Sequence, residues 1–300
     1  MINVLLIGLG GLGLRHAQSL IADEKVNLFI YEKSEEVLRK NLKQIEDQSR
    51  VKILNNINQS NKNYFCVIVA TPSLPRLEVL KEIREFDIQF FILEKFLFPS
   101  LAEFDEFEEI YSDRLNKIYI NCPRRYYDFY KELSGKGELL GMTVTGSSWS
   151  MATNAIHFLD LFSFLTDDAI NQGQIISHLR KTKSKRDGYD ELIGEIIFHN
   201  KKRRSLLLSC KESKIEDFNI HLNFEGLEIQ IDEIKKSAHI RKGGKDELKK
   251  IQIPFQSQLT ASYINDLKKL GSCELVNYST SSNLHRIFLE TIKNTGANIT

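Results

Sequence analysis

The segment VLLIGLGGLGLRH, residues 4–16, places four glycines within six positions directly after an apolar run. Gly8, Gly10 and Gly13 have the spacing G-x-G-x-x-G. Inside a regular element glycine costs about 0.5–1 kcal/mol relative to alanine, so this density indicates backbone that must turn tightly or approach another group closely. The spacing is typical of the turn between the first strand and first helix of a dinucleotide-binding βαβ unit.

Each glycine has an expected task in such a unit. The first permits the tight turn, the second lets a pyrophosphate approach the backbone, and the third lets the helix pack on the strand. Glu32 follows the next apolar run, residues 26–31, where a carboxylate would bind the ribose hydroxyls of adenosine. A carboxylate there repels the 2′-phosphate of NADP, so NAD is favoured, although Lys33 and Ser34 leave NADP open.

The first 120 residues alternate strand-like and helix-like patterns. Strand-like runs lie at 3–7, 26–31, 51–54, 64–70, 88–93 and 118–121, and amphipathic runs at 14–22, 35–47, 75–86 and 101–115. Several strand-like runs are almost entirely apolar, as expected of parallel strands buried on both faces. The pattern predicts a Rossmann-type, doubly wound parallel sheet that forms an NAD(P)-binding domain over residues 1–120.

After residue 121 the pattern changes to one helical run followed by shorter alternating runs. The helical runs lie at 154–166, 257–270 and 280–293, and the alternating runs at 174–181, 190–198, 204–210, 218–224, 227–231, 236–241 and 249–253. This predicts an α+β domain over residues 121–300 with a largely antiparallel, open-faced sheet for substrate binding and oligomerisation. A sheet covered on one face only favours self-association, so we expect a homodimer or homotetramer.

Composition excludes several classes of protein. The formal net charge of the 300 residues is +1, which argues against a nucleic-acid partner. The four cysteines lie far apart without a C-x-x-C pair, which argues against a metal site and favours a reducing compartment. Because no apolar stretch is long enough to span a membrane, we expect a cytoplasmic protein without membrane contact.

Five segments together carry a family resemblance. They are GLGGLGLRHAQSL (8–20), VIVATPSLPRLEVL (67–80), LEKF (93–96), HFLDLFSFL (157–165) and LHRIFLETI (284–292). In this order they resemble the glycine turn, A-T-P turn, E-K-P signature, G-x-H-x-x-D-L helix and closing helix of the Gfo/Idh/MocA oxidoreductases, which include glucose–fructose oxidoreductase and inositol dehydrogenase. Three positions depart from that pattern. Phe96 replaces the proline, Arg76 stands where histidine is common, and Thr153 stands where many members have aspartate.

The resemblance implies a set of cofactor-binding residues. This set is Gly8, Gly10, Gly11, Leu12, Gly13, Arg15, His16, Glu32, Ala70, Thr71, Pro72, Glu94 and Lys95. It also implies that Lys95 and His157 are catalytic. Lys95 ends a buried strand at the ligand-binding edge of the sheet, where partial desolvation suits a proton donor or relay, although it also fits a surface lysine.

Further residues are expected to contact the substrate. Asn154, His157 and Asp160 recur at helical spacing, so Asp160 could orient the imidazole, although a lone helix histidine is often a core residue. Asn121, Arg124 and Arg125 occur where the two domains join, and paired arginines suit a substrate carboxylate or phosphate. The alternative for the two arginines is a solvated helix terminus.

The resemblance implies hydride transfer between a hydroxyl-bearing carbon of a sugar, sugar acid or nucleotide sugar and the nicotinamide of NAD or NADP. Two other functions on the same fold stay open. One is a non-catalytic NAD(P)-binding sensor, for which the departures at Phe96 and Thr153 would be typical. The other is NAD-dependent glycoside cleavage. The presence of both Lys95 and His157 favours an enzyme over a sensor.

Overall fold

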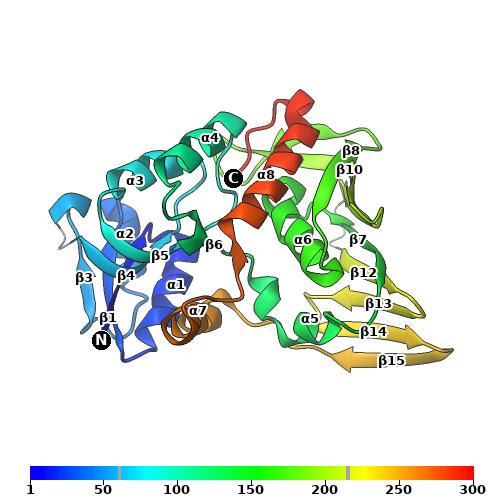
Figure 1. Ribbon diagram of the computed structural model, residues 1–300, viewed down its shortest axis with the longest axis horizontal. Helices are drawn as coiled ribbons and strands as arrows, with labels where there is room; N and C mark the ends of the chain where they lie inside the picture. Colours follow the sequence, from blue (N-terminus) through cyan, green and yellow to red (C-terminus); the bar gives the residue numbers. More distant parts are fainter. Residues whose placement is uncertain (60–61, 214–216) are drawn as a thin grey trace. The chain divides into compact units, whose positions relative to one another are not determined.

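The computed structural model describes residues 1–59, 62–213 and 217–300, and these form two compact units (Figure 1). The first unit contains Met1–Pro123 and Pro254–Ser279, and the second contains Arg124–Ile253 and Thr280–Thr300. Residues 254–279 therefore group with the N-terminal unit, whereas a single division at residue 120 assigns them to the second domain. The difference arises because an amphipathic helix pattern does not show which sheet the helix packs against.

The first unit is built on a seven-stranded sheet with the order β16-β6-β5-β4-β1-β2-β3. The strands are β1 (Ile2–Ile7), β2 (Val26–Tyr31), β3 (Val51–Ile53), β4 (Asn63–Val69), β5 (Asp87–Leu93), β6 (Ile118–Ile120) and β16 (Val276–Asn277). All neighbours pair in parallel except β16, which is antiparallel to β6. Residues Val4–Ile7 of β1 are at most 1 % exposed. The predicted doubly wound parallel sheet is confirmed.

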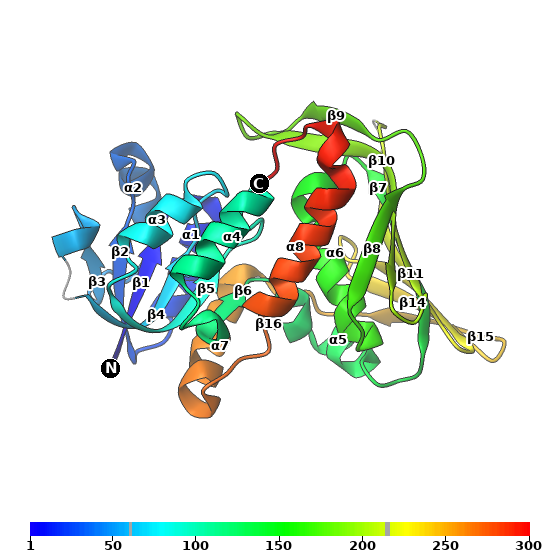
Figure 2. The same cartoon turned by 45° about the horizontal axis from the view of Figure 1, so that its top comes forward.

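The helices of this unit start and stop at recognisable residues. They are α1 (Gly11–Ile21), α2 (Glu35–Leu42), α3 (Arg76–Glu82), α4 (Leu101–Ile110) and α7 (Gln256–Leu270). The hydroxyls of Ser34 and Ser100 cap α2 and α4 by accepting from Val37 and Glu103 amides. Helix α7 lies along α1 (Figures 1 and 2). Between them, Ser19 Oγ accepts from the Ala261 amide at 3.0 Å.

The approach of α1 to β1 depends on one missing side chain. A Cβ built on Gly13 would lie 2.0 Å from the carbonyl oxygen of Gly8. Gly8 itself has a φ of +94°, and a Cβ there would lie 3.0 Å from the oxygen of Ala70. The glycine-rich turn therefore lets helix, turn and neighbouring strand meet closely. The amphipathic pattern places the start of α1 later, at residue 14, because glycine is a poor helix former.

The second unit is built on a nine-stranded sheet in which β9 pairs only with β10. The strands are β7 (Leu139–Ser147), β8 (Ile170–Ile175), β9 (Arg180–Lys183), β10 (Asp190–Asn200), β11 (Ser205–Lys211), β12 (Phe218–Phe224), β13 (Leu227–Asp232), β14 (Ser237–Lys242) and β15 (Lys245–Lys250). All neighbours are antiparallel except β7 and β11. Strand β7 was not predicted, because two glycines interrupt its alternation.

Helices cover one face of this sheet. Helix α6 (Met151–Thr166) packs on β7, β10 and β11 (Figures 1 and 2). Phe288 of α8 (Tyr278–Ile292) stacks on Phe198 of β10, with ring centroids 6.3 Å apart. A short helix, α5 (Asp128–Leu133), precedes β7. On the opposite face, polar residues lie side by side on neighbouring strands, among them Thr143, His221 and Gln230. The predicted open-faced sheet is confirmed, and self-association through it stays a prediction.

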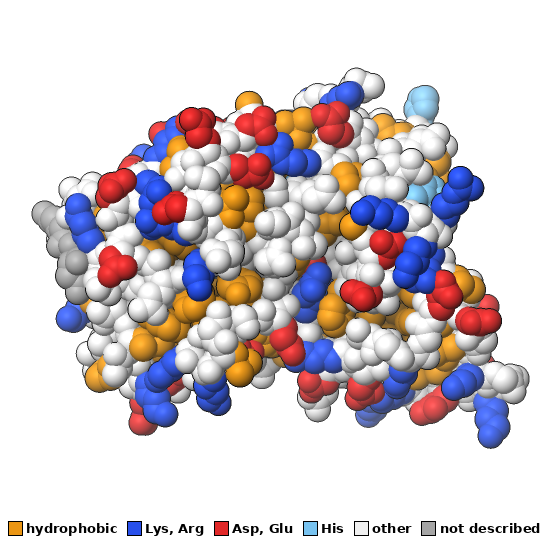
Figure 3. Space-filling model, in the orientation of Figure 1, with side chains coloured by type: hydrophobic (Ala, Val, Ile, Leu, Met, Phe, Trp, Pro, Cys, Tyr) orange, Lys and Arg blue, Asp and Glu red, His pale blue; other side chains and the backbone are white. Residues whose placement is uncertain are grey.

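No helix in the described ranges is long and apolar enough to cross a membrane. On the face drawn in Figure 3, acidic and basic side chains are intermingled. This distribution agrees with the small formal net charge of +1.

We predict that Gly13→Ala lowers the free energy of unfolding by about 1–3 kcal/mol, because the added methyl group overpacks the contact between α1 and Gly8. Gly11→Ala is the matched control, since a Cβ on Gly11 meets nothing within 4 Å. Urea unfolding followed by circular dichroism measures both variants. Equal stability of the two variants would contradict the packing argument.

Candidate functional site

A cavity of about 440 Å³ opens at the carboxyl ends of β1, β2 and β4 in the first unit. It is lined by Ile7, Gly8, Gly10, Tyr31, Glu32, Lys33, Val37, Ala70, Thr71, Pro72, Pro75, Glu78, Val79 and Glu82. Strand β1 lies between β2 and β4. The sheet extends from β1 through β2 to β3 on one side, and through β4 to β5 and β6 on the other. In open α/β sheets ligands bind at such a switch point, so the strand order alone predicts a ligand-binding site at this cavity.

The glycine turn presents bare backbone to the cavity. A Cβ on Gly10 would meet nothing within 4 Å, so this position borders open space. Gly10 is also the N-cap of α1, and no side chain caps the helix there. The first amides of α1 and the positive end of its dipole therefore suit an anionic ligand such as a pyrophosphate.

Glu32 is fixed at the cavity wall by two backbone amides. Its Oε2 accepts from the Leu9 amide at 2.7 Å, and its Oε1 accepts from the Ser34 amide at 2.8 Å. A carboxylate offers about four acceptor positions, so further hydrogen bonds from a diol can be accepted. The structure thus places Glu32 beside the glycine turn, and its binding of a ribose stays a prediction.

Helices α2 and α3 add walls that sequence analysis did not assign. Val37 and Val79 contribute apolar surface of the kind that suits a flat aromatic base. Glu78 and Glu82 also line the cavity, and Glu78 pairs with Lys81 at 2.8 Å. Their i,i+4 spacing places both carboxylates on one face of α3, which is the signal that would have grouped them.

Lys95 lies in the turn after β5, and a buried arginine holds that turn. Arg76 is 1 % exposed. Its guanidinium donates to the carbonyl oxygens of Glu94, Phe96 and Leu97, the last at 3.0 Å. It also donates to the carbonyl oxygen of Thr71 in the cavity wall. The Lys95–Phe96 peptide bond is cis.

Three residues predicted to contact ligands instead join a closed ring of hydrogen bonds that are buried or partly buried. His16 Nε2 lies 2.8 Å from Glu94 Oε1, and His16 Nδ1 lies 2.8 Å from Thr260 Oγ1. Asn121 Nδ2 donates to Glu94 Oε1 at 2.5 Å and to Gln256 Oε1 at 3.0 Å. Gln256 Nε2 closes the ring on Thr260 Oγ1 at 3.1 Å. Because His16, Glu94 and Asn121 are at most 3 % exposed, their side chains bind one another rather than face the cavity.

The remaining predicted cofactor residues divide into two groups. Gly8, Gly10, Glu32, Ala70, Thr71 and Pro72 line the cavity. Gly11, Leu12 and Gly13 form the first turn of α1, and the exposed Arg15 donates to Gln18 at 2.9 Å.

Both arginines expected to bind substrate are engaged inside the second unit. Arg124 makes a bidentate contact with Glu233, at 2.9 Å from Nε and 2.6 Å from Nη2. Arg125 binds Asp160, at 3.0 Å from Nε and 2.8 Å from Nη2. Burial raises the pKa of Asp160, and Arg125 opposes that rise. Asp160 therefore pairs with Arg125, and its orientation of His157 stays a prediction.

The first turn of α6 receives a carboxylate from β10. Glu191 accepts from the amides of Ala152 at 3.0 Å and Thr153 at 3.4 Å, and from the Thr153 hydroxyl. Asn154 instead donates to the Trp149 carbonyl at 2.9 Å. His157 lies one turn further along α6 and is partly exposed. Glu191 was missed because it reaches this position from a strand 38 residues away in sequence.

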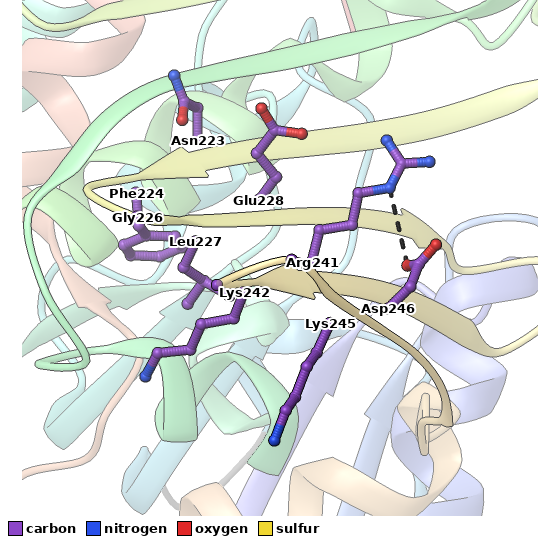
Figure 4. A pocket seen from close by; sticks show the side chains of 11 residues that line it. Asn223, Phe224, Gly226, Leu227, Glu228, Arg241, Lys242, Lys245 and Asp246 are labelled. Atoms are coloured by element: carbon purple, nitrogen blue, oxygen red, sulfur yellow. Dashed lines mark ion pairs between the residues drawn. The ribbon is translucent and has the colours of Figure 1, made fainter.

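The second unit has a shallow pocket at two hairpin tips, with a volume of about 380 Å³ (Figure 4). Lys242 and Lys245 extend in one direction, whereas Arg241 and Asp246 form an ion pair with 3.7 Å between Nε and Oδ1. Within the described ranges, no three His, Cys, Asp or Glu residues are grouped to hold a metal ion. The cavity at the glycine turn is therefore the stronger candidate site.

No protein-family model matches the sequence, and no curated protein matches it in sequence. Solved structures do match it in fold. UDP-N-acetylglucosamine 3-dehydrogenase GnnA from Acidithiobacillus ferrooxidans is 13% identical, with 97% of this chain and 96% of that chain covered and a TM-score of 0.77. An oxidoreductase from Agrobacterium radiobacter in complex with NAD+, L-tartaric acid and magnesium is 11% identical, with 98% and 96% covered and a TM-score of 0.77.

A third similar structure is biliverdin reductase from Synechocystis sp. PCC 6803 in complex with biliverdin and NADP+. It is 12% identical, covers 98% of this chain and 99% of its own, and has a TM-score of 0.75. At these identities the likeness concerns the fold. The resemblance predicted from the sequence motifs is confirmed at that level, and the chain has the fold of the Gfo/Idh/MocA-type oxidoreductases.

Proposed function

We propose that this protein is an NAD-dependent oxidoreductase that transfers a hydride between a hydroxyl-bearing carbon of a sugar, sugar acid or nucleotide sugar and nicotinamide. The observation that carries the proposal is the cavity at the switch point, where the glycine turn and Glu32 lie together. The similar structures support it, because one is a nucleotide-sugar dehydrogenase and another contains NAD+.

The residues of the cavity fit the adenosine half of the cofactor. Gly10 and the first amides of α1 would hold the pyrophosphate, and Glu32 would accept hydrogen bonds from the ribose diol. Val37 and Val79 would contact the adenine ring. The bound nicotinamide supplies the hydride acceptor or donor.

Lys95 and His157 are the proposed proton-handling residues. In the direction of oxidation, His157 takes the substrate hydroxyl proton, and Lys95 donates a hydrogen bond to that oxygen or relays its proton. Lys95 is suited to this role because it follows β5 in a turn that Arg76 holds by three backbone carbonyls. Its position at the carboxyl end of a parallel strand is where such sheets present catalytic groups.

A second candidate function is an NAD-binding sensor without catalysis. One observation favours it. Ion pairs within the second unit engage Arg124, Arg125 and Asp160, which were expected to contact substrate. A sensor would bind NAD at the same cavity and turn over no substrate, so binding and turnover must be measured separately.

We predict that NAD binds more tightly than NADP, because Glu32 repels a 2′-phosphate. Glu32→Ser should weaken NAD binding about tenfold and narrow the difference between the two cofactors, since it removes hydrogen bonds to the diol and the negative charge. Glu24→Ser, an exposed position outside the cavity, is the control. Titration calorimetry with both cofactors gives the affinities. Tighter binding of NADP by the unaltered protein would contradict the assignment.

We predict that Lys95→Ala and His157→Ala each lower kcat by about 10²–10⁴-fold and leave NAD affinity within threefold. The assay follows NADH absorbance with a panel of sugars, sugar acids and nucleotide sugars. Lys117→Ala and His221→Ala serve as controls of matched residue type. Full turnover by folded His157→Ala would show that this histidine is not catalytic. NAD binding without turnover of any compound in the panel would favour the sensor.

A further inference from the structure

Arg76 connects the wall of the cofactor cavity at Thr71 to the turn that follows β5. It is the first residue of α3 and is 1 % exposed. Its Nη1 donates to the carbonyl oxygens of Glu94, Phe96 and Leu97, and its Nη2 donates to the carbonyl oxygen of Thr71. One side chain therefore binds the turn that carries Lys95 and the wall that contains Thr71.

The chemistry of the guanidinium suits this arrangement. A buried cation must be compensated, and here four carbonyl dipoles face it. Arginine stays charged and directs five N–H donors in a rigid plane, so it can fix several carbonyls in one geometry. Lysine ends in a single nitrogen on a flexible stem, so it cannot bind the Glu94–Leu97 carbonyls and the Thr71 carbonyl through two nitrogens held in one plane.

A second arginine in the same unit also binds several backbone carbonyls, but it contacts neither the cavity wall nor the Lys95 turn. Arg50 donates to the backbone carbonyls of Ile21, Asp23 and Val26 at 2.6–3.1 Å. It thereby fixes the turn between α1 and β2, and it does not line the cavity. If Arg76 acted only on stability, substitution of either arginine would have the same kind of effect.

We propose that Arg76 is a positioning residue, which fixes Lys95 relative to the dinucleotide by holding the carbonyls on both sides of it and tying them to Thr71. This inference rests on the proposed function, because it assumes that Lys95 acts in the reaction. It adds that occupation of the cavity is transmitted to the Lys95 turn through the Arg76 guanidinium.

The test compares Arg76→Lys, Arg76→Met and the control Arg50→Lys. In Arg76→Lys, kcat should fall at least tenfold with KM for the substrate within threefold. Arg76→Met should lose more, so that lysine at this position restores part of the activity. In Arg76→Lys, an N-hydroxysuccinimide ester should also acylate the Lys95 amine at least threefold faster than in the unaltered protein. Mass spectrometry of the Lys95 peptide measures this rate. Arg50→Lys should change the unfolding midpoint and neither of these readouts.

A measurement on the unaltered protein does not depend on a variant that folds. Addition of NAD should slow hydrogen–deuterium exchange at residues 94–97 as well as at Ala70 and Thr71. Slowing at Ala70 and Thr71 alone, or folded Arg76→Lys with wild-type kcat and wild-type acylation of Lys95, would overturn the inference. Full turnover by Lys95→Ala would instead refute the assigned role of Lys95, and absence of NAD binding would refute the proposed function itself.

Discussion

The contact between Gly13 and the carbonyl of Gly8 is the constraint on which the candidate site depends. A single methyl group at position 13 would lie 2.0 Å from that oxygen, so α1 can start where it does only because glycine is there. The start of α1 sets where its first amides point. The same turn passes Leu9, whose amide fixes the Glu32 carboxylate at 2.7 Å. Helix, turn and carboxylate are thus placed by one close backbone approach.

Buried polar groups hold the segment around Lys95. Arg76 binds four backbone carbonyls, and the ring that contains His16 and Glu94 joins β5 to α1 and α7. Each hydrogen bond in such a network offsets part of the cost of burying a polar group, which is about 1–3 kcal/mol for a group left unpaired. Arg76 therefore holds the backbone carbonyls of the segment around Lys95. The ring holds the same segment through the side chain of Glu94.

The parts of the fold that could be predicted are those that depend on residues close together in the sequence. Strands buried on both faces appear as continuous apolar runs, and the glycine spacing marks the cofactor turn, so the parallel sheet and the Glu32 position follow from the sequence. Strand β7 escaped detection because Gly141 and Gly146 interrupt it. The return of α7 and β16 to the first unit was not predictable, because it depends on contacts between segments far apart in the chain.

Charged side chains were harder to assign for the same reason. The sequence identifies Arg124 and Arg125 as a pair, yet their partners Glu233 and Asp160 lie 109 and 35 residues away. Only the folded chain shows that these charges neutralise each other. Glu191, which reaches the first turn of α6 from β10, carries no local signal at all. Local spacing therefore predicts backbone geometry well, and the partners of ionised groups require the structure.

The most direct test of this account is a crystal structure of the protein with NAD. The account predicts the ribose hydroxyls of adenosine within hydrogen-bond distance of Glu32 and the pyrophosphate against Gly10 and the first amides of α1. Adenine should lie against Val37 and Val79. Density for NAD at another place, such as the hairpin pocket beside Lys242, with the glycine turn bare, would contradict it.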